Sequence, residues 1–422
     1  MEGYRRFLWR LLAVSVFVTC VYTYMCVRDA IPDELNLRAG QTQELSFNLP
    51  LRVQGEIEKS SVPAAAGREE TIGESLHLNL QKNCQIATSQ TGDYRMQCRL
   101  FGIFPLKQVN IHVVEDMKVI PAGVPIGIYL KTSGVMVIGT GEVKGMDGMS
   151  YEPAYSLVKS GDYIEQVNGE TVYNKRDLIE LVNKSDGQAV LTLRREGKEL
   201  KVKVKCIRTA GDEQKMGIWV RDNTQGIGTI TYVTEEGYFG ALGHGINDVD
   251  TGGLMELENG SLYATEIVSV IKGSDGSPGA LEGVIYYNND AKRGTILKNT
   301  DCGIFGMVDE KLQQKISQEA IPICLKQEIK KGPAVIRCTV NGETKEYQVE
   351  IEEVRLNSQE LNKGLVMRVT DQELLETTGG IVQGMSGSPI IQDGKLVGAV
   401  THVFVNDSAK GYGIFIENML KQ

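Results

Sequence analysis

The sequence predicts a mainly β protein with an N-terminal membrane anchor, and three observations support this fold class. Residues 209–422 are rich in Gly, Val, Ile and Thr and contain many short runs with the period-two alternation of strands, but few long amphipathic helices. Residues 31–116 contain further short alternating runs, whereas residues 7–27 are almost wholly apolar. A chain of 422 residues, 41% hydrophobic and 23% charged, has the composition of an ordinary globular protein with two or three domains.

The apolar stretch near the N-terminus predicts a membrane anchor or export signal over residues 1–30. Arg5 and Arg6 precede the stretch, and a positive flank of this kind keeps the N-terminal end in the cytoplasm. The stretch approaches the ~20 residues that a bilayer requires, provided that the Arg10 side chain reaches the interface. Since no Ala-x-Ala-like site precedes Ile31, we expect an uncleaved anchor; a cleavable signal and a buried core helix are the alternatives.

Charge and cysteine spacing exclude several classes of partner. The formal net charge is -9 and no basic run follows the N-terminus, which argues against nucleic acid as a partner. The eight cysteines lack the short paired spacings of a zinc site, so we expect neither a metal nor a cofactor. The β-rich region 31–116 carries no catalytic pattern, and its His77 and His112 are expected to be structural. Cys84 and Cys98 either face each other across a hairpin or are two buried thiols.

Residues 117–208 form a second predicted unit, marked by Gly161 and Asp162 followed by the run YIEQVNG at 163–169. A helical run and two closing strands follow, and the whole pattern resembles a PDZ domain, an α+β fold. Asn and Gly at 168–169 suit a tight turn between two strands. The resemblance implies that the amides of residues 126–128, namely Ile126, Gly127 and Ile128, hold a peptide carboxylate beside an open strand edge. The alternative is a PDZ-like brace whose groove is empty or filled by the chain itself.

Residues 209–422 are predicted to form a pair of small antiparallel barrels with a cleft between them, since an α/β-hydrolase would need parallel strands alternating with helices. In this region the run GMSGSPI at 384–390 places Ser386 in a glycine-framed loop before a strand, as around the nucleophile of chymotrypsin-like peptidases. The amides of Gly384 and Ser386 are the expected oxyanion donors, because Gly384 has no side chain to obstruct a substrate carbonyl. Ser388 is the alternative nucleophile.

A second glycine-framed segment supplies the predicted base. His244 lies between Gly243 and Gly245 after a mostly apolar run, which predicts an open turn at a barrel edge. A serine hydroxyl attacks an amide poorly unless an imidazole takes its proton, so His244 is the predicted general base. His402, in the strand after the nucleophile, is the alternative base and is expected to pack near the substrate-binding edge.

The third catalytic member is predicted to be Asp371, which ends an alternating strand fifteen positions before Ser386 and can fix the imidazole tautomer. The alternatives are carboxylates with the character of solvated turn residues: Asp248, Asp250 and Asp393. The run GSDGSPG at 273–279 imitates a nucleophile loop, but its glycine and proline spacing predicts an ordinary turn.

Together these features resemble the stage IV sporulation protein B family of endospore-forming bacteria over nearly the full length. The features are the anchor, the PDZ-like unit with its VNG turn, the turn at His244 and the loop at Ser386. The resemblance implies a serine endopeptidase exported from the forespore into the space between the forespore and mother-cell membranes. There it would cleave itself and a membrane regulatory protein, stage IV sporulation protein FA, and so trigger intramembrane processing of pro-sigma-K. It also implies His244, Asp371 and Ser386 as the catalytic residues.

Two other functions fit parts of the sequence. A non-catalytic PDZ scaffold in the envelope would need only the anchor and the peptide groove. An envelope-quality protease similar to the HtrA group also combines a serine peptidase with a PDZ domain, but there the peptidase comes first, the reverse of the order here. Met385 before the serine and the late position of Asp371 depart from trypsin-like enzymes.

Overall fold

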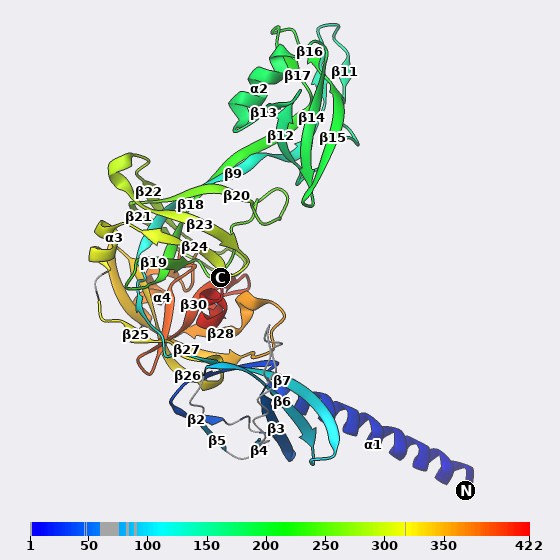
Figure 1. The fold of residues 1–422 in the computed structure, drawn as a ribbon, viewed down its shortest axis with the longest axis vertical. Helices are drawn as coiled ribbons and strands as arrows, with labels where there is room; N and C mark the ends of the chain where they lie inside the picture. Colours follow the sequence, from blue (N-terminus) through cyan, green and yellow to red (C-terminus); the bar gives the residue numbers. More distant parts are fainter. Residues whose placement is uncertain are drawn as a thin grey trace, which may run out of the picture. The chain divides into compact units, whose positions relative to one another are not determined.

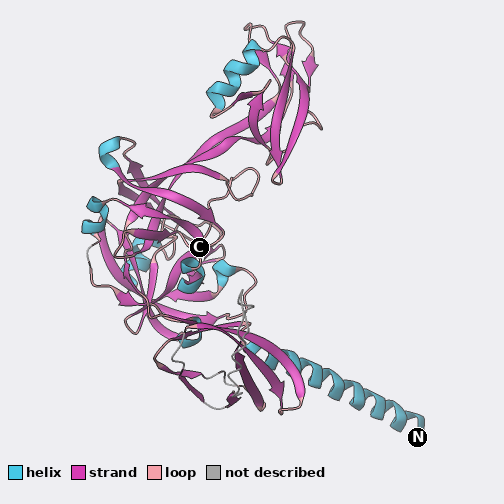
Figure 2. Cartoon of the chain, in the orientation of Figure 1, coloured by secondary structure: helices cyan, strands magenta, loops and turns pink. Residues whose placement is uncertain are grey.

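The computed structural model describes residues 2–45, 47, 49–59, 76–81, 84–87, 91–316 and 318–422, and most of its regular structure is strand (Figure 2). Two compact units are present. The first consists of Met1–Lys118, Pro322–Lys330 and Val354–Glu360, and the second of Val119–Ile321, Lys331–Glu353 and Leu361–Gln422. The predicted fold class is confirmed, because the chain contains an apolar N-terminal helix, a β-rich region, a PDZ-like unit and paired barrels.

The first unit begins with the helix α1 (Glu2–Ala30), which is long and apolar enough to cross a membrane. Its last turns enter a hydrophobic core, where Val27 and Ile31 are fully buried. A five-stranded sheet and a two-stranded sheet supply the rest of the unit. The larger has the order β1 (Glu34–Arg38), β7 (Phe104–Val114), β6 (Gly92–Leu100), β3 (Val53–Lys59), β4 (Leu76–Asn79), and the smaller pairs β2 (Thr42–Leu45) with β5 (Cys84–Ala87).

The positions of Cys84 and Cys98 decide whether they face each other across a hairpin. Cys84 lies in β5 and Cys98 in β6, which belong to different sheets, and all eight cysteines of the chain are free thiols. The hairpin disulfide is therefore wrong, because the two strands do not pair. Cys98 is buried in the apolar core, and this burial raises the pKa of its thiol to about 12.

Six strands of the second unit close into a first barrel. Each strand pairs with the next in the order β9 (Pro125–Thr140), β20 (Leu257–Tyr263), β23 (Lys292–Thr300), β24 (Gly303–Val308), β19 (Tyr238–Ala241) and β18 (Ile218–Val233), and β18 returns to β9. Their inward side chains form one core, which includes Ile128, Ile230 and Leu262. The hairpin of β21 (Thr265–Ile271) and β22 (Ala280–Ile285) extends from this barrel between β20 and β23.

A second closed barrel follows, as predicted. Its order is β26 (Gly332–Val340), β27 (Glu343–Val354), β28 (Leu365–Val369), β31 (Asp407–Phe415), β30 (Lys395–Phe404) and β29 (Pro389–Gln392). The helix α4 (Gln372–Thr378) lies between β28 and β29 in the sequence. The other short elements are β8 (Lys118–Pro121), β25 (Ile321–Pro322), α3 (Glu310–Lys315), α5 (Ile416–Leu420), η1 (Asn289–Ala291), η2 (Lys326–Glu328) and η3 (Leu361–Lys363).

The PDZ-like unit is built between two strands of the first barrel. It contains the helix α2 (Lys175–Lys184) and the strands β10 (Val143–Lys144), β11 (Ser150–Tyr151), β12 (Tyr163–Val167), β13 (Glu170–Thr171), β14 (Gln188–Arg195), β15 (Lys198–Lys205), β16 (Ile207–Arg208) and β17 (Gln214–Lys215). The far half of β9 pairs with β12, and the near half pairs with β20 of the barrel. Figure 1 shows the long strands β9 and β18 running side by side between these parts.

This pairing does not follow the predicted boundary between 117–208 and 209–422. Residues 125–132 lie before the PDZ-like core in the sequence, yet their backbone groups pair with β18 and β20 of the first barrel. A strand is assigned by its partners, which only the tertiary structure shows. The strand pairing therefore shows that the PDZ-like unit is inserted into the first barrel. The predicted limits of 1–30 and 31–116 concern the first unit and stay predictions.

Candidate active site

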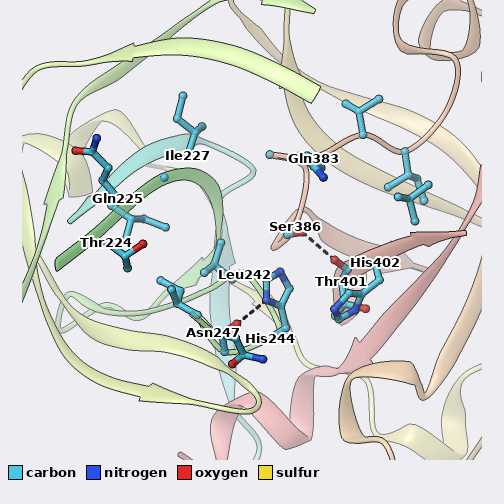
Figure 3. Close-up of a pocket in the computed structure, with 18 residues that line it drawn as sticks. Thr224, Gln225, Ile227, Leu242, His244, Asn247, Gln383, Ser386, Thr401 and His402 are labelled. Carbon is cyan, nitrogen blue, oxygen red and sulfur yellow. Dashed lines mark hydrogen bonds between the residues drawn. The ribbon is translucent and has the colours of Figure 1, made fainter. Parts of the chain in front are cut away.

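A cleft of about 500 Å³ is lined by both barrels and contains the predicted nucleophile and base. The first barrel supplies Ile128 of β9, part of β18 and the turn after β19, and the second supplies residues 381–384, Ser386 and residues 401–403. Figure 3 shows the side chains of His244, Ser386 and His402 gathered on one side of the cleft. The tertiary structure thus brings together two residues that are 142 positions apart in the sequence, Ser386 and His244.

Ser386 lies in a sharply turned loop that only glycines permit. Gly384 and Gly387 both have φ of +97°, in the left-handed region that disfavours side chains. A Cβ on Gly387 would lie 2.0 Å from the carbonyl oxygen of Thr229, so the loop and β18 are in direct backbone contact. The Ser386 hydroxyl donates a hydrogen bond of 2.8 Å to the Thr401 carbonyl, which holds it at the cleft.

The loop leaves two amides available for an oxyanion. The N–H groups of Met385, Gly387 and Ser388 donate to the carbonyls of Val382, Val400 and Met385. Within the described part of the chain, the N–H groups of Gly384 and Ser386 make no backbone hydrogen bond. These are the two predicted oxyanion donors, and N–H groups that the backbone does not use suit a developing negative charge.

Two threonines of β18, which the sequence analysis missed, hold the nucleophile loop from the other barrel. The Thr229 hydroxyl donates to the Gly384 carbonyl at 2.8 Å, and the Thr231 hydroxyl donates to the Gly387 carbonyl at 2.8 Å. The Thr229 amide also donates to the Ser386 carbonyl at 3.0 Å. The sequence signal that could have identified them is the alternation of threonines within an apolar strand, since residues two apart lie on the same face.

His244 follows β19 on a turn in which Leu242 and Gly243 both have φ of +71°. Its Nδ1 lies 2.8 Å from the Gly245 carbonyl oxygen. Because a carbonyl only accepts, Nδ1 carries the hydrogen and Nε2 keeps its lone pair, which is the tautomer that a general base requires. Burial lowers the pKa of His244 below its ordinary value, although the bond to Gly245 opposes this in part, so the ring stays neutral to lower pH.

His402, the alternative base, lies against His244. Their ring centroids are 4.9 Å apart with planes inclined by 37°. His402 belongs to β30, next to the Thr401 carbonyl that accepts from Ser386, and it lines the same cleft. His402 therefore lines the cleft, and its packing near a substrate-binding edge stays a prediction.

The structure does not bring Asp371 to the cleft. Asp371 caps the N-terminus of α4, where one carboxylate oxygen accepts from the Leu374 amide at 3.1 Å and the other from the Gln348 amide at 3.2 Å. Asp248 and Asp250 instead form ion pairs with Arg221. Among the described residues no carboxylate lines the cleft. The group that orients His244 in this structure is the Gly245 carbonyl, and a backbone oxygen leaves no residue-type signal in a sequence.

Two other serine-containing segments, at Ser388 and at residues 273–279, lie outside the cleft lining. Ser388 is fully buried and does not line the cleft, so the structure presents Ser386 and not Ser388 to a substrate. Residues 273–279 form the turn between β21 and β22, and the Gly273 amide donates to the Thr378 carbonyl at 2.8 Å. Beside this turn, the Leu281 amide donates to the Gln383 carbonyl at 2.8 Å, so the hairpin supports the chain just before the nucleophile loop.

The predicted carboxylate loop of the PDZ-like unit is wrong. Ile126, Gly127 and Ile128 pair with residues 226–228 of β18 on one side, and Gly127 and Ile128 pair with β20 on the other. Their backbone groups are therefore used inside the barrel and present no open edge. Within the described residues, an open edge lies instead at 218–221 of β18, which pairs only with β9.

The helix α2 is hydrogen-bonded to the residue that follows this open edge and to the strand β17 that precedes it. At its N-terminus the Lys175 amide donates to the Asp222 carboxylate at 2.9 Å, and near its C-terminus the Asn183 side chain accepts from the Gln214 amide at 2.8 Å. An edge strand beside a helix is the arrangement in which an extended peptide adds to a sheet.

Comparison with known proteins identifies one family and several structures of low similarity. Residues 212–420 match the model of the family described as SpoIVB peptidase S55. No curated protein matches the chain. The match does not include residues 125–140, so the strand β9 of the first barrel lies outside it.

Three solved structures illustrate the range of matches. The PDZ domain of the SdrC-like protein from Listeria innocua is 16% identical, with a TM-score of 0.18, over 21% of this chain and 93% of that chain. The active form of the Rv3671c protease from M. tuberculosis is 16% identical, with a TM-score of 0.29, over 47% of this chain and 74% of that chain. The HtrA-type protease AlgW with a decapeptide is 12% identical, with a TM-score of 0.28, over 72% of this chain and 63% of that chain.

Proposed function

Through residues 212–420 the chain belongs to the SpoIVB peptidase S55 family and is a serine peptidase, and we propose that it is a sporulation signalling endopeptidase. In this proposal it is exported across the forespore membrane and cleaves itself. It then cleaves a membrane regulatory protein, stage IV sporulation protein FA, which triggers intramembrane processing of pro-sigma-K. The observation that supports peptide hydrolysis is the single cleft that both His244 and Ser386 line.

The proposed chemistry uses the Ser386 hydroxyl and the His244 ring, whose hydrogen bonds hold both groups at the cleft. The Ser386 hydroxyl turns from the Thr401 carbonyl toward His244 Nε2, which takes its proton as the oxygen attacks the substrate carbonyl. The amides of Gly384 and Ser386 receive the oxyanion, and the imidazolium then gives its proton to the leaving amine. The Gly245 carbonyl keeps its bond to Nδ1–H and stabilises the imidazolium through both steps.

Localisation and substrate capture follow from two other regions. The helix α1 supports an uncleaved anchor, because Val27 and Ile31 at its end are fully buried in the core of the first unit and removal of the helix would take Val27 with it. We place peptide docking at the open edge of residues 218–221 beside α2. A substrate segment held there lies on the same strand as part of the cleft lining, because β18 continues from this edge to residues 224–227.

A map of new N-termini tests the proposed function. The full chain, purified in detergent, is incubated alone and with the membrane regulatory protein, and the products are analysed by mass spectrometry. We expect self-cleavage and substrate cleavage by the natural chain, and a loss of about 10⁴-fold or more in rate for Ser386→Ala. The matched control is Ser388→Ala, because Ser388 is two residues away but buried outside the cleft.

The result also separates the other functions. If the natural chain and Ser386→Ala give the same N-termini while both are folded, the peptidase proposal fails and a PDZ scaffold remains. If the natural chain degrades unfolded proteins broadly but leaves the regulatory protein intact, an envelope-quality protease replaces the signalling role.

A further inference from the structure

Among the residues that the structure describes, none with a carboxylate, ammonium or guanidinium group lines the cleft around Ser386. Eighteen residues line it, and none of them is Asp, Glu, Lys or Arg, although 23% of the whole chain is charged. Aliphatic side chains come from both barrels, including Ile227 and Leu242 from the first and Ile381, Val382 and Val403 from the second. A substrate side chain that enters this cleft is therefore desolvated without an ionic partner.

The position of the residue on the acyl side of the scissile bond follows from Ser386. When the hydroxyl attacks, the substrate carbonyl oxygen points to the amides of Gly384 and Ser386. The acyl-side side chain then lies between the two segments that converge on this serine, residues 381–383 and 401–403. Figure 3 shows Gln383 on one side of Ser386 and Thr401 and His402 on the other.

The floor of this pocket is filled by an isoleucine. Ile381 is 2% exposed, and a Cβ on Gly411 would lie 2.3 Å from its Cδ1 atom. Gly411 pairs with Val403 of the neighbouring strand, so the Ile381 side chain occupies the space beside Val403. The Ile381 side chain therefore narrows the aliphatic part of the cleft beside Val403.

The charged side chains of β31 do not alter this conclusion. Asp407 is bound to Arg368 at 2.9 Å, and Arg368 and Lys410 both bind Glu352, at 2.9 Å and 2.6 Å. None of these four residues lines the cleft. A basic substrate side chain would have to break this paired arrangement to find a carboxylate.

We propose that the cleft selects a short aliphatic residue, Ala or Val, on the acyl side of the scissile bond. Charged residues are excluded because their burial here would leave an unpaired charge, and Phe is excluded because Ile381 fills the floor. The inference rests on the proposed peptidase function and deepens it, since it names the substrate class of the same site.

The test is a series of internally quenched peptides that differ only in this residue: Ala, Val, Phe, Lys or Glu. The parent sequence is a self-cleavage site found by N-terminal mapping, and the enzyme is the full chain in detergent. We expect kcat/KM for Ala and Val to exceed the values for Lys and Glu by about 100-fold or more. Equal cleavage after Lys or Glu would overturn the inference.

Two variants test the residues that form the pocket. Ile381→Ala should raise kcat/KM for the Phe peptide about tenfold relative to the Val peptide, because the floor is removed. Val403→Asp should raise the relative rate for the Lys peptide, whereas the control Val405→Asp should not, because Val405 is 58% exposed and outside the cleft lining. Thermal unfolding checks that each variant is folded. If Ile381→Ala is unfolded, the comparison of Val403→Asp with Val405→Asp still tests the inference.

The outcomes separate this inference from the function on which it rests. If no peptide is cleaved and the natural chain equals Ser386→Ala, the peptidase function fails and the inference fails with it. If peptides are cleaved with another order of preference, or if Val405→Asp changes the Lys rate as much as Val403→Asp, only the selectivity inference is overturned.

Discussion

At the scale of single residues, burial and one backbone carbonyl suit His244 to its proposed role as the base. Burial lowers the pKa of its imidazole, so the base stays neutral at a pH where an exposed histidine, with a pKa of about 6.5, begins to protonate. In the proposed mechanism, activity requires the neutral ring. We therefore expect kcat/KM to fall only as the pH drops below about 6.5.

The measurement is a pH profile of kcat/KM with the Val peptide, with Ser386→Ala as the background. The same sign applies to stability: the unfolded chain binds the proton more readily, so the contribution of neutral His244 is lost as the pH falls through the depressed value. An acid limb centred at or above the ordinary histidine value would contradict the assignment of His244.

Asp371 is a helix cap in this structure, and a pair of substitutions distinguishes that role from a catalytic one. Asn is as good an N-cap as Asp, so Asp371→Asn should keep the acceptor of the Leu374 amide and lose only that of the exposed Gln348 amide, with kcat within a few-fold of the natural chain. Asp371→Ala should cost about 1 kcal/mol of unfolding free energy, because the Leu374 amide loses its acceptor. The measurements are chemical denaturation and kcat.

A large loss of kcat in Asp371→Asn without a loss of stability would show that the carboxylate acts as the triad acid. A fall of about 10⁴-fold is the size expected when an asparagine replaces the aspartate that orients a catalytic histidine.

At the scale of elements, the strand β18 joins three tasks. Its start offers an open edge beside α2, its middle lines the cleft, and its end holds the nucleophile loop through Thr229 and Thr231. The two threonines are almost completely buried, so water cannot replace their hydrogen bonds to the loop. Loss of either bond therefore costs free energy.

Thr229→Val tests this support. The change keeps the shape but leaves the Gly384 carbonyl without its donor, and we expect a loss of about 1–3 kcal/mol in stability together with a tenfold or larger fall in kcat. The control is Thr295→Val on β23, where the side chain is exposed in the same barrel. If both variants behave alike, the contact does not position the loop.

At the scale of the whole molecule, the PDZ-like unit and the first barrel share two strands. Deletion of residues 117–208, the unit as the sequence delimits it, removes the barrel half of β9 and leaves β18 and β20 without their partner. We expect this variant to be insoluble or unfolded.

A second variant respects the strand pairing. Lys131 and Asn223 are paired partners, so residues 132–222 are replaced by Asn-Gly, which forms a two-residue hairpin turn. We expect this variant to fold and to cleave the short Val peptide, while losing selectivity for the membrane substrate. Circular dichroism and peptide assays provide the readouts, and folding of the first variant together with unfolding of the second would reverse the conclusion.

The sequence determined the local chemistry of this protein. Alternating runs predicted strands, the apolar run predicted α1, and the glycines around Ser386 and His244 predicted loops that expose a nucleophile and a base, because each of these signals depends on residues close together in the chain. The tertiary structure decided the rest: Asp371 caps a helix, residues 126–128 lie inside a barrel, and Thr229 holds a loop from the other barrel. These outcomes depend on which distant strands pair, and on backbone carbonyls such as that of Gly245, and neither leaves a residue-type pattern in the sequence.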